Sequence, residues 1–219
     1  MADCDVLSRT GGNIRRPPAT HVYRGRVFVR RRELILSAAA LAIPGTPLRA
    51  HEAAEFALPE EFLPAVVPIR NEFAPGEIHV LPDQFRLYLT LPENRAIRYA
   101  VGVGRPGLYH AGTFVVGRKA KWPSWTPTPE MIERDPDAYA PFAEGMPGGP
   151  DNPLGARALY LHDLSGCDTY LRIHGTDKPR TIGTRVSNGC ARLTNDQIAD
   201  LYERVPLGTR VYLYDQKLS

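Results

Sequence analysis

The strongest constraint on the fold is a series of short β-rich runs, each bounded by residues that favour turns. Within the runs, apolar and polar side chains alternate with a period of two, as they do in strands whose successive side chains point to opposite faces. The runs lie at residues 78–81, 85–91, 96–103 and 113–118. Prolines and acidic residues separate the first three. We therefore predict an antiparallel meander over the first three runs, continued by the fourth.

The C-terminal part of the chain repeats this pattern once and adds a helix. Residues 158–162 and 169–174 read as a hairpin around Ser165-Gly166, and residues 209–214 as a closing strand. A helix fits 196–204, with Thr194 or Asn195 as its N-cap. A chain of 219 residues with 43% hydrophobic content has room for one sizeable core. These features predict one mostly β domain with one or two small helices.

Residues 122–155 interrupt the strand pattern. They contain two tryptophans and eight prolines, with a candidate helix over 129–134. Long segments of this kind inside compact domains are usually lids, binding loops or disordered, and the tryptophans argue against disorder. Trp122 and Trp125 either line a lid over a substrate cleft or anchor the loop on the core. The sequence does not decide between these two interpretations.

The basic residues are concentrated at the N-terminus. The chain has 27 Lys+Arg and 24 Asp+Glu, of which nine and three lie in residues 1–50, so 18 basic and 21 acidic residues remain after them. The remainder is slightly acidic. Bulk charge therefore gives no support to a nucleic-acid partner.

Residues 1–50 read as a leader with an export signal. Arg30-Arg31-Arg32-Glu33 precedes an apolar stretch over 34–43 and a small-residue exit over 44–50. The stretch is too short for a transmembrane span, so we expect none after signal removal. The arginines resemble a twin-arginine signal; ordinary secretion and a buried core helix are the alternatives. Cleavage after Ala50 would leave a lead-in over 51–76 and remove Cys4.

Cys190 is the candidate nucleophile. It lies among small and polar residues, in Ser187-Asn188-Gly189-Cys190-Ala191-Arg192. Only the thiolate is a good nucleophile, so a catalytic cysteine needs a base or a cation nearby. His174, at the end of an apolar strand, is the best base. Gly189 allows a tight turn, and backbone amides at 188–190 are candidates for an oxyanion hole. The alternative is a buried thiol beside an unrelated turn.

A second histidine, His162, competes for the role of base. If Ser165-Gly166 forms a two-residue turn, His174 faces Arg157 and His162 faces Thr169. His162 would then lie about 15 Å along the strand from His174. It is therefore interpreted as an ordinary strand residue. The same geometry places Cys167 far from His174, so we expect an independent thiol rather than a disulfide with Cys190.

Three linked motifs give the chain a specific resemblance. They are Ile173-His174-Gly175-Thr176, Ile182-Gly183 and Ser187-Asn188-Gly189-Cys190-Ala191-Arg192-Leu193. In this order they resemble the signature of the L,D-transpeptidase (YkuD) family, and residues 148–161 resemble the approach to its histidine strand. The resemblance spans residues 77–215. It implies a mainly β catalytic domain, a mixed-strand sandwich with an open-barrel-like sheet.

The resemblance also implies roles for the motif residues. Cys190 would attack a peptidoglycan tetrapeptide stem at its third residue, usually meso-diaminopimelate, and expel D-alanine. His174 would be the base, held by the carbonyl of Gly175, with an oxyanion hole at Gly189 and Cys190. Arg192 matches the family arginine and suits a stem carboxylate, with a structural ion pair as the alternative. Ser187 also matches the family motif and is a candidate substrate-binding residue that positions through its hydroxyl, with a mere turn residue as the alternative. Asn188 departs from members with histidine there, so no role transfers to it.

The expected protein is thus a periplasmic acyltransferase that passes the stem to an amine and needs no metal or other cofactor. An envelope protein is one possible acceptor. Hydrolysis by an L,D-carboxypeptidase or amidase is the alternative within the same chemistry. A noncatalytic peptidoglycan-binding module is the alternative outside it.

Overall fold

The computed structural model of the chain describes residues 57–70 and 73–217. The predicted leader and export signal, residues 1–50, lie outside these ranges, as does the predicted cleavage point. Within the described residues, no helix is long and apolar enough to cross a membrane.

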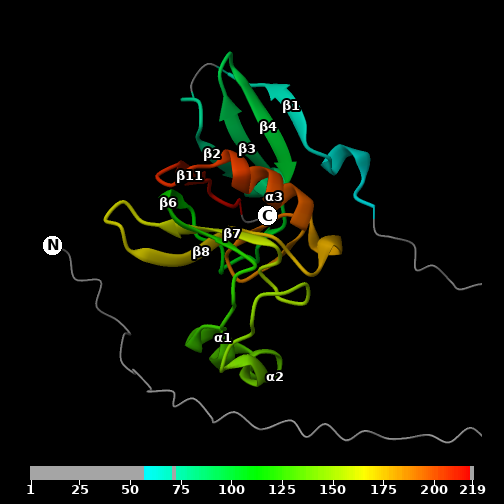
Figure 1. Ribbon diagram of the computed structural model, residues 1–219, viewed down its shortest axis with the longest axis vertical. Helices are drawn as coiled ribbons and strands as arrows, with labels where there is room; N and C mark the ends of the chain where they lie inside the picture. The colour runs from blue at the N-terminus through cyan, green and yellow to red at the C-terminus, as the bar shows by residue number, and fades with distance from the viewer. Residues whose placement is uncertain (1–56, 71–72, 218–219) are drawn as a thin grey trace, which may run out of the picture. The chain divides into compact units, whose positions relative to one another are not determined.

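Nine strands form one mixed sheet in the spatial order β1-β4-β3-β2-β11-β6-β7-β8-β10 (Figure 1). In chain order they are β1 (Ala65–Pro68), β2 (Ile78–Leu81), β3 (Arg86–Leu91), β4 (Arg95–Ala100), β6 (Gly112–Lys121), β7 (Arg157–His162), β8 (Asp168–His174), β10 (Ala191–Arg192) and β11 (Arg210–Leu213). A separate pair joins β5 (Val103–Gly104) to β9 (Arg185–Ser187).

The helices are short. The α-helices are α1 (Pro129–Arg134), α2 (Pro136–Tyr139) and α3 (Asn195–Arg204), and the 3-10 turns are η1 (Glu60–Phe62), η2 (Pro82–Gln84), η3 (Ala140–Phe142) and η4 (Pro179–Thr181). The mainly β, mixed-strand architecture predicted from the sequence is confirmed. The helices at 129–134 and 196–204 are confirmed as well, and α2 is an additional short one.

The predicted meander is confirmed for β2, β3 and β4, which pair antiparallel in sequence order. The prediction that β6 continues it is wrong. After Ala100 the chain leaves the sheet, because the Gly102 amide donates to the Arg192 carbonyl and β5 pairs with β9. Strand β11 pairs in parallel with the free edge of β2, and its other edge pairs antiparallel with β6. The lead-in contributes β1 to the edge of β4.

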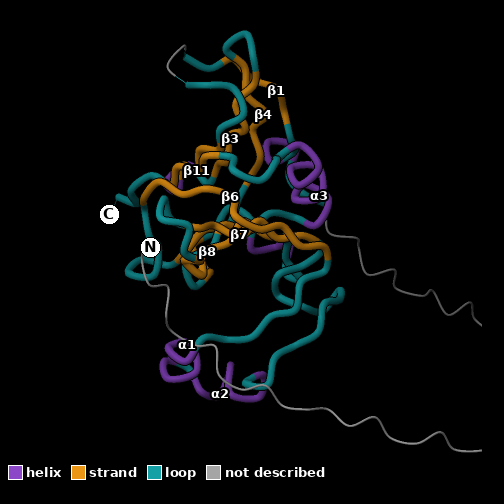
Figure 2. The backbone as a smooth tube through the Cα atoms, turned by 60° about the vertical axis from the view of Figure 1, so that its left-hand side comes forward, coloured by secondary structure: helices purple, strands orange, loops and turns teal. Residues whose placement is uncertain are grey.

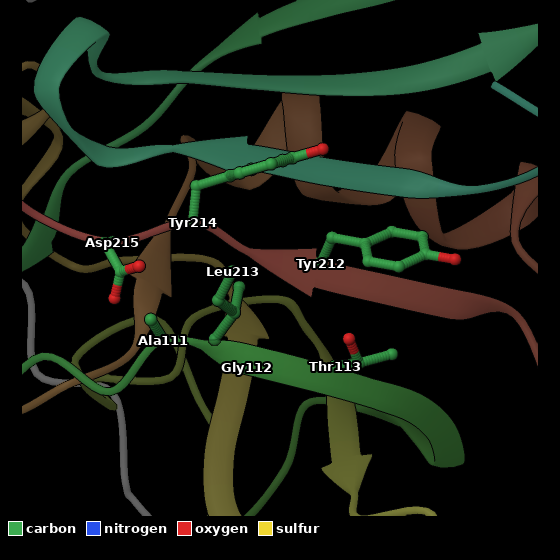
Figure 3. A pocket seen from close by; sticks show the side chains of 7 residues that line it. All are labelled: Ala111, Gly112, Thr113, Tyr212, Leu213, Tyr214 and Asp215. Carbon is green, nitrogen blue, oxygen red and sulfur yellow. The ribbon is translucent and has the colours of Figure 1, made fainter. Parts of the chain in front are cut away.

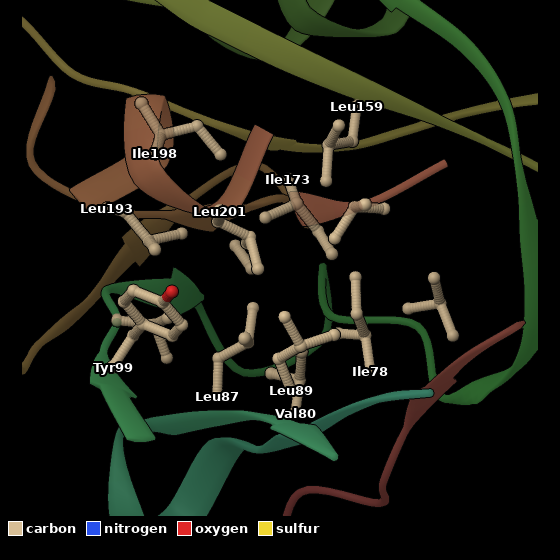
Figure 4. Packing of buried hydrophobic residues seen from close by; sticks show 14 of the residues in the cluster. Ile78, Val80, Leu87, Leu89, Tyr99, Leu159, Ile173, Leu193, Ile198 and Leu201 are labelled. Atoms are coloured by element: carbon tan, nitrogen blue, oxygen red, sulfur yellow. The ribbon is translucent and has the colours of Figure 1, made fainter. Parts of the chain in front are cut away.

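The core lies between two parts of this sheet. Figure 4 shows Ile78, Leu87 and Tyr99, from β2 to β4, on one side and Leu159 and Ile173, from β7 and β8, on the other. Apolar side chains of α3 complete the packing beside them. Burying a side chain of this size stabilises the fold by about 1.5–3 kcal/mol.

Helix α3 is fixed at its start and along its length. The hydroxyl of Thr194 accepts the Gln197 amide, so the N-cap is Thr194. The Tyr99 hydroxyl donates to Asp200 at 2.5 Å, which gives a buried phenol a partner on the helix. This bond joins α3 to β4, and the helix also lies against β7.

The β7–β8 hairpin differs from its predicted register. His162 pairs with Asp168 because the connection is a five-residue loop rather than a two-residue turn, and His174 pairs with Ala158 because the register shifts between Tyr160 and His162. The carboxylate of Asp163 accepts the amides of Ser165 and Cys167 and so stabilises this longer loop. The functional inference is unchanged: His162 and His174 lie at opposite ends of the hairpin.

Residues 122–156 form an excursion between β6 and β7. Figures 1 and 2 show α1 and α2 set apart from the strands, at the end of two connecting segments. The helices are capped locally, since Thr128 accepts the Met131 amide and Asp135 accepts the Ala138 amide. Neither helix has a buried residue. The two helices are thus held by local capping, while the end of the excursion is anchored by the buried Leu154 and Ala156.

Candidate active site

Cys190 and His174 are brought together by two neighbouring strands. Ala191 pairs in parallel with Ile173, and Arg192 pairs with His174. Cys190 directly precedes β10, so by the two-residue period its side chain lies on the same face as that of Arg192, and therefore as that of His174. The register thus gives the two side chains a common face of the sheet.

The imidazole of His174 is buried, with 3% of the residue exposed. Its Nδ1 lies 2.6 Å from the carbonyl oxygen of Gly175. A carbonyl can only accept, so Nδ1 carries the proton and Nε2 keeps the lone pair of a base. Burial, with a further contribution from the Arg192 charge, lowers the pKa of His174 to about 3. The ring is therefore neutral near pH 7 and available to accept a proton.

Gly175 and its neighbours fix the end of β8. A Cβ at Gly175 would collide with the side-chain oxygen of Asn195, which already accepts the amide of Ala156 at 2.9 Å. Only glycine fits this close approach between the histidine strand and the start of α3. The carbonyl that orients His174 is thereby held by a packed backbone.

Burial raises the pKa of the Cys190 thiol. The backbone amide of Arg172 and the charges of Arg172 and Arg192 act in the opposite direction and favour the thiolate. The resting pair is therefore a neutral thiol beside a neutral imidazole. Proton transfer must accompany attack on a substrate, in surroundings that stabilise the resulting anion.

The loop before Cys190 is closed by Ser187. Its hydroxyl donates to the Cys190 carbonyl at 2.6 Å and accepts the Gly189 amide at 3.3 Å. Gly189 has a φ of +123°, and a Cβ there would lie 2.8 Å from the carbonyl oxygen of Leu108. Both hydrogen bonds of the Ser187 hydroxyl are thus made within the loop that carries Cys190. Because the Gly189 amide already has a weak partner, the Cys190 amide is the better placed oxyanion donor.

Arg192 is half-buried, and its Nε has no hydrogen-bond partner among the described residues. Burial lowers its pKa, while Cys190, Asp177 and Tyr139 act to raise it. Within the same described ranges it forms no ion pair at 4.0 Å or less. A guanidinium with unused donors next to the nucleophile fits an anionic ligand better than a structural ion pair.

The two tryptophans behave differently. Trp125 packs its ring against Tyr139 and Phe142, with centroids 6.3 and 5.9 Å apart, and bridges to Met146. It holds the excursion together from within. Trp122 is 46% exposed at the start of the excursion.

The structure adds residues to which the sequence gave no role. The side-chain oxygen of Asn188 accepts from Arg105 at 3.0 Å and from Arg134 at 2.8 Å, and its amide donates to the Tyr139 hydroxyl at 2.8 Å. Asn188 lies two residues before Cys190, so it joins the catalytic loop to α1 and α2. The departure from the family's histidine at this position was the only signal in the sequence.

Cys190 is a free thiol, so the prediction that it does not pair with Cys167 is confirmed. The prediction that Cys167 is an independent thiol is wrong, because Cys167 is disulfide-bonded. Spacing alone cannot reveal such a bond.

A hollow of about 340 Å³ lies elsewhere, between β6 and the end of β11 (Figure 3). It is lined by Ala111, Gly112, Thr113, Tyr212, Leu213, Tyr214 and Asp215. None of the predicted site residues lines it.

The comparisons with known proteins agree with this geometry. The model of the L,D-transpeptidase catalytic domain, YkuD, matches residues 75–213. The "Probable L,D-transpeptidase ErfK/SrfK" of Escherichia coli strain K12 is 38% identical over 143 residues, which cover 62% of this chain and 43% of that protein. The chain thus spans less than half the length of this relative.

A second relative matches over more of its length. The "Putative L,D-transpeptidase in ATP synthase subunits region ORF 5" of Fuscovulum blasticum is 36% identical over 172 residues, covering 71% of this chain and 85% of that protein. Among solved structures, a "Probable carnitine operon oxidoreductase caia" from Brucella melitensis is 45% identical with a TM-score of 0.50, covering 74% of this chain and 96% of that one. Its name concerns a different reaction, so it supports the fold and not the activity.

Proposed function

The chain belongs to the L,D-transpeptidase catalytic-domain (YkuD) family, and from this premise we propose that it is a periplasmic cysteine acyltransferase acting on peptidoglycan stem peptides. The observation that carries the proposal is the register of β8 and β10. It places a buried neutral base, His174, on the same face as the free thiol of Cys190. A noncatalytic binding module would have no use for this pairing.

The proposed reaction begins at the carbonyl of the third stem residue. The Cys190 sulfur attacks the carbonyl carbon while Nε2 of His174 takes the thiol proton. Negative charge on the carbonyl oxygen is stabilised by the Cys190 amide, with Gly189 contributing once its weak bond to Ser187 is released. The carbon–nitrogen bond to D-alanine then breaks, and the imidazolium returns its proton to the leaving amine.

The second half of the reaction transfers the acyl group. An amine attacks the thioester carbon, His174 accepts the amine proton, and Cys190 leaves as the thiol. The Gly175 carbonyl stabilises the transient imidazolium in the place that a carboxylate takes in a Ser-His-Asp triad. Arg192 is proposed to hold a carboxylate of the stem peptide near the thioester.

The proposal includes the export of the chain through residues 1–50, by the twin-arginine or the ordinary secretory route. An envelope protein and a second stem peptide are both suitable amine acceptors.

The test is incubation of the purified protein with tetrapeptide muropeptides, followed by mass spectrometry. We expect released D-alanine together with cross-linked products, and exchange of the terminal residue when a free D-amino acid is added. Cys190→Ala should give neither. Equal product from this variant would overturn the proposal, and release of D-alanine without any exchange would identify an L,D-carboxypeptidase instead.

A further inference from the structure

Three arginines surround the catalytic loop. Arg192 lies two residues after Cys190, while Arg105 and Arg134 reach the loop from the segment after β5 and from α1. The latter two donate to the same atom, the side-chain oxygen of Asn188, at 3.0 and 2.8 Å. The Arg105 charge also lowers the pKa of Arg192, so these two cations act on each other.

Four other arginines of the described residues are paired with acidic side chains. Arg95, Arg172, Arg185 and Arg204 each lie within 3.0 Å of a carboxylate oxygen. Within residues 57–70 and 73–217, Arg105 and Arg134 have no carboxylate oxygen within 4.0 Å. Two guanidinium groups on one neutral oxygen repel each other. The charge of Arg134 also acts on the Glu130 carboxylate of the same helix, which is more than 4.0 Å from it and so does not pair with it directly. An anion placed between them would relieve this repulsion.

We propose that Arg105 and Arg134 form a second carboxylate-binding subsite, distinct from Arg192, which receives a carboxylate of the stem peptide. The inference rests on the proposed function. Each guanidinium donates one N–H group to Asn188, and its other N–H groups can bind a ligand. The planar arrangement of these donors suits a carboxylate. Asn188 holds the two side chains in place through a neutral oxygen, so its position does not cancel their charge.

The placement of the subsite links recognition to the excursion. The Tyr139 hydroxyl accepts a hydrogen bond from the side-chain nitrogen of Asn188. Arg134 and Tyr139 belong to the excursion, whereas Arg105 and Asn188 directly follow strands β5 and β9. All of Arg105, Arg134 and Tyr139 are at least partly exposed. A stem that carries two carboxylates close to the scissile bond can engage Arg192 with one and this subsite with the other.

The experiment uses three synthetic tetrapeptide stems: one with free carboxylates, one amidated at the diaminopimelate side-chain carboxylate, and one amidated at the terminal alanine carboxylate. For each stem, kcat/KM for release of the terminal residue is measured with wild type and with Arg105→Gln/Arg134→Gln. We expect the double variant to lose about 10- to 100-fold on the free stem. On one amidated stem the loss should shrink to less than about 3-fold, which identifies the carboxylate that is bound.

Two further variants separate charge from structure. Arg105→Lys/Arg134→Lys keeps both charges and should recover part of the lost activity on the free stem. Arg210→Gln removes one exposed charge at the start of β11, outside the site, and should leave the activity on all three stems unchanged. Equal loss on all three stems in the glutamine variant would overturn the subsite, because a merely structural role does not depend on the charge of the substrate.

A binding measurement distinguishes failure of the subsite from failure of the proposed function. If wild type releases nothing from any stem, the proposed function fails. Calorimetric titration of the three stems into Cys190→Ser, with and without the two glutamine substitutions, still tests the subsite. Equal affinities for the free and amidated stems in Cys190→Ser would contradict it.

Discussion

The strand edge around Cys190 and the excursion over residues 122–156 are held by different kinds of contact. The edge is fixed by backbone pairing, by the buried Ile173 and by close backbone packing at Gly175 and Gly189, where a Cβ would collide with neighbouring atoms. The excursion has no buried residue in α1 or α2 and meets the catalytic loop through side-chain hydrogen bonds to Asn188. Groups that move protons are thus held by the main chain, and groups that are suited to bind a ligand are held by exchangeable polar contacts.

The largest expected effect comes from removing the proton acceptor, His174, from the strand edge around Cys190. His174→Ala should lower kcat/KM for D-alanine release by about 1000-fold or more, because the nucleophile then has no proton acceptor. The matched control is His162→Asn, at the other end of the hairpin, which should retain activity within about 3-fold. A comparable loss in both variants would mean that the histidines do not have separate roles.

The second expected effect concerns pH and the same histidine. The pKa of His174 falls from 6.5 in the unfolded chain to about 3 in the folded one, so between these values only the unfolded chain binds the proton. The stability that this burial gives is complete above pH 6.5 and is lost as the pH falls toward 3. From pH 7 to pH 4, wild type should lose about 3 kcal/mol more than His174→Gln.

Urea unfolding of both proteins at the two pH values measures this difference. The carboxylates that titrate in this range are shared by both proteins and cancel in the comparison. Parallel losses in the two proteins would show that the imidazole is not held neutral by burial.

A smaller effect is expected at the boundary between the two regions. Arg192→Gln should lower kcat/KM by about 10- to 100-fold, or about 2 kcal/mol, through loss of a charge-assisted contact with the stem. The free energy of unfolding should change by less than about 1 kcal/mol, since no ion pair is broken. Steady-state kinetics and urea unfolding check the two expectations, and a large loss of stability would favour a structural role.

The smallest effect tests the attachment of the excursion itself. Asn188→Ala removes the three hydrogen bonds that join it to the catalytic loop, at a net cost of about 1 kcal/mol. Hydrogen exchange at residues 129–139 should become faster by roughly 5-fold, while the amides of β8 keep their protection. Unchanged exchange in α1 and α2 would show that Trp125 and the caps are sufficient to hold the excursion.

Much of the fold could be predicted because its signals are local. The period of two predicted β2, β3 and β7 closely, and Thr194 was one of the two candidate N-caps for α3. Pairing between distant strands has no such signal. Nothing near residue 211 reveals that β11 lies between β2 and β6, and the bond of the Asp163 carboxylate to Cys167 that lengthens the hairpin loop depends on side-chain geometry.

The site residues likewise divide into those with a local sequence signal and those without one. Cys190, His174 and Arg192 were predicted because they lie in compact motifs close together in the sequence. Arg105 and Arg134 were missed, because each reaches Asn188 across 83 and 54 residues of chain. An arginine in a proline-rich loop has no pattern that distinguishes it from a solvated surface charge.

The position of β11 has a consequence for how the protein acquires its structure. β2 and β6 flank a strand that follows them by some 90 residues or more, so neither can complete its pairing until residues 210–213 have emerged. Such non-local pairing slows folding, since the loop must close before its contacts form. A chain that stops short of β11 would expose two open edges of the sheet, and aggregation should be its main fate.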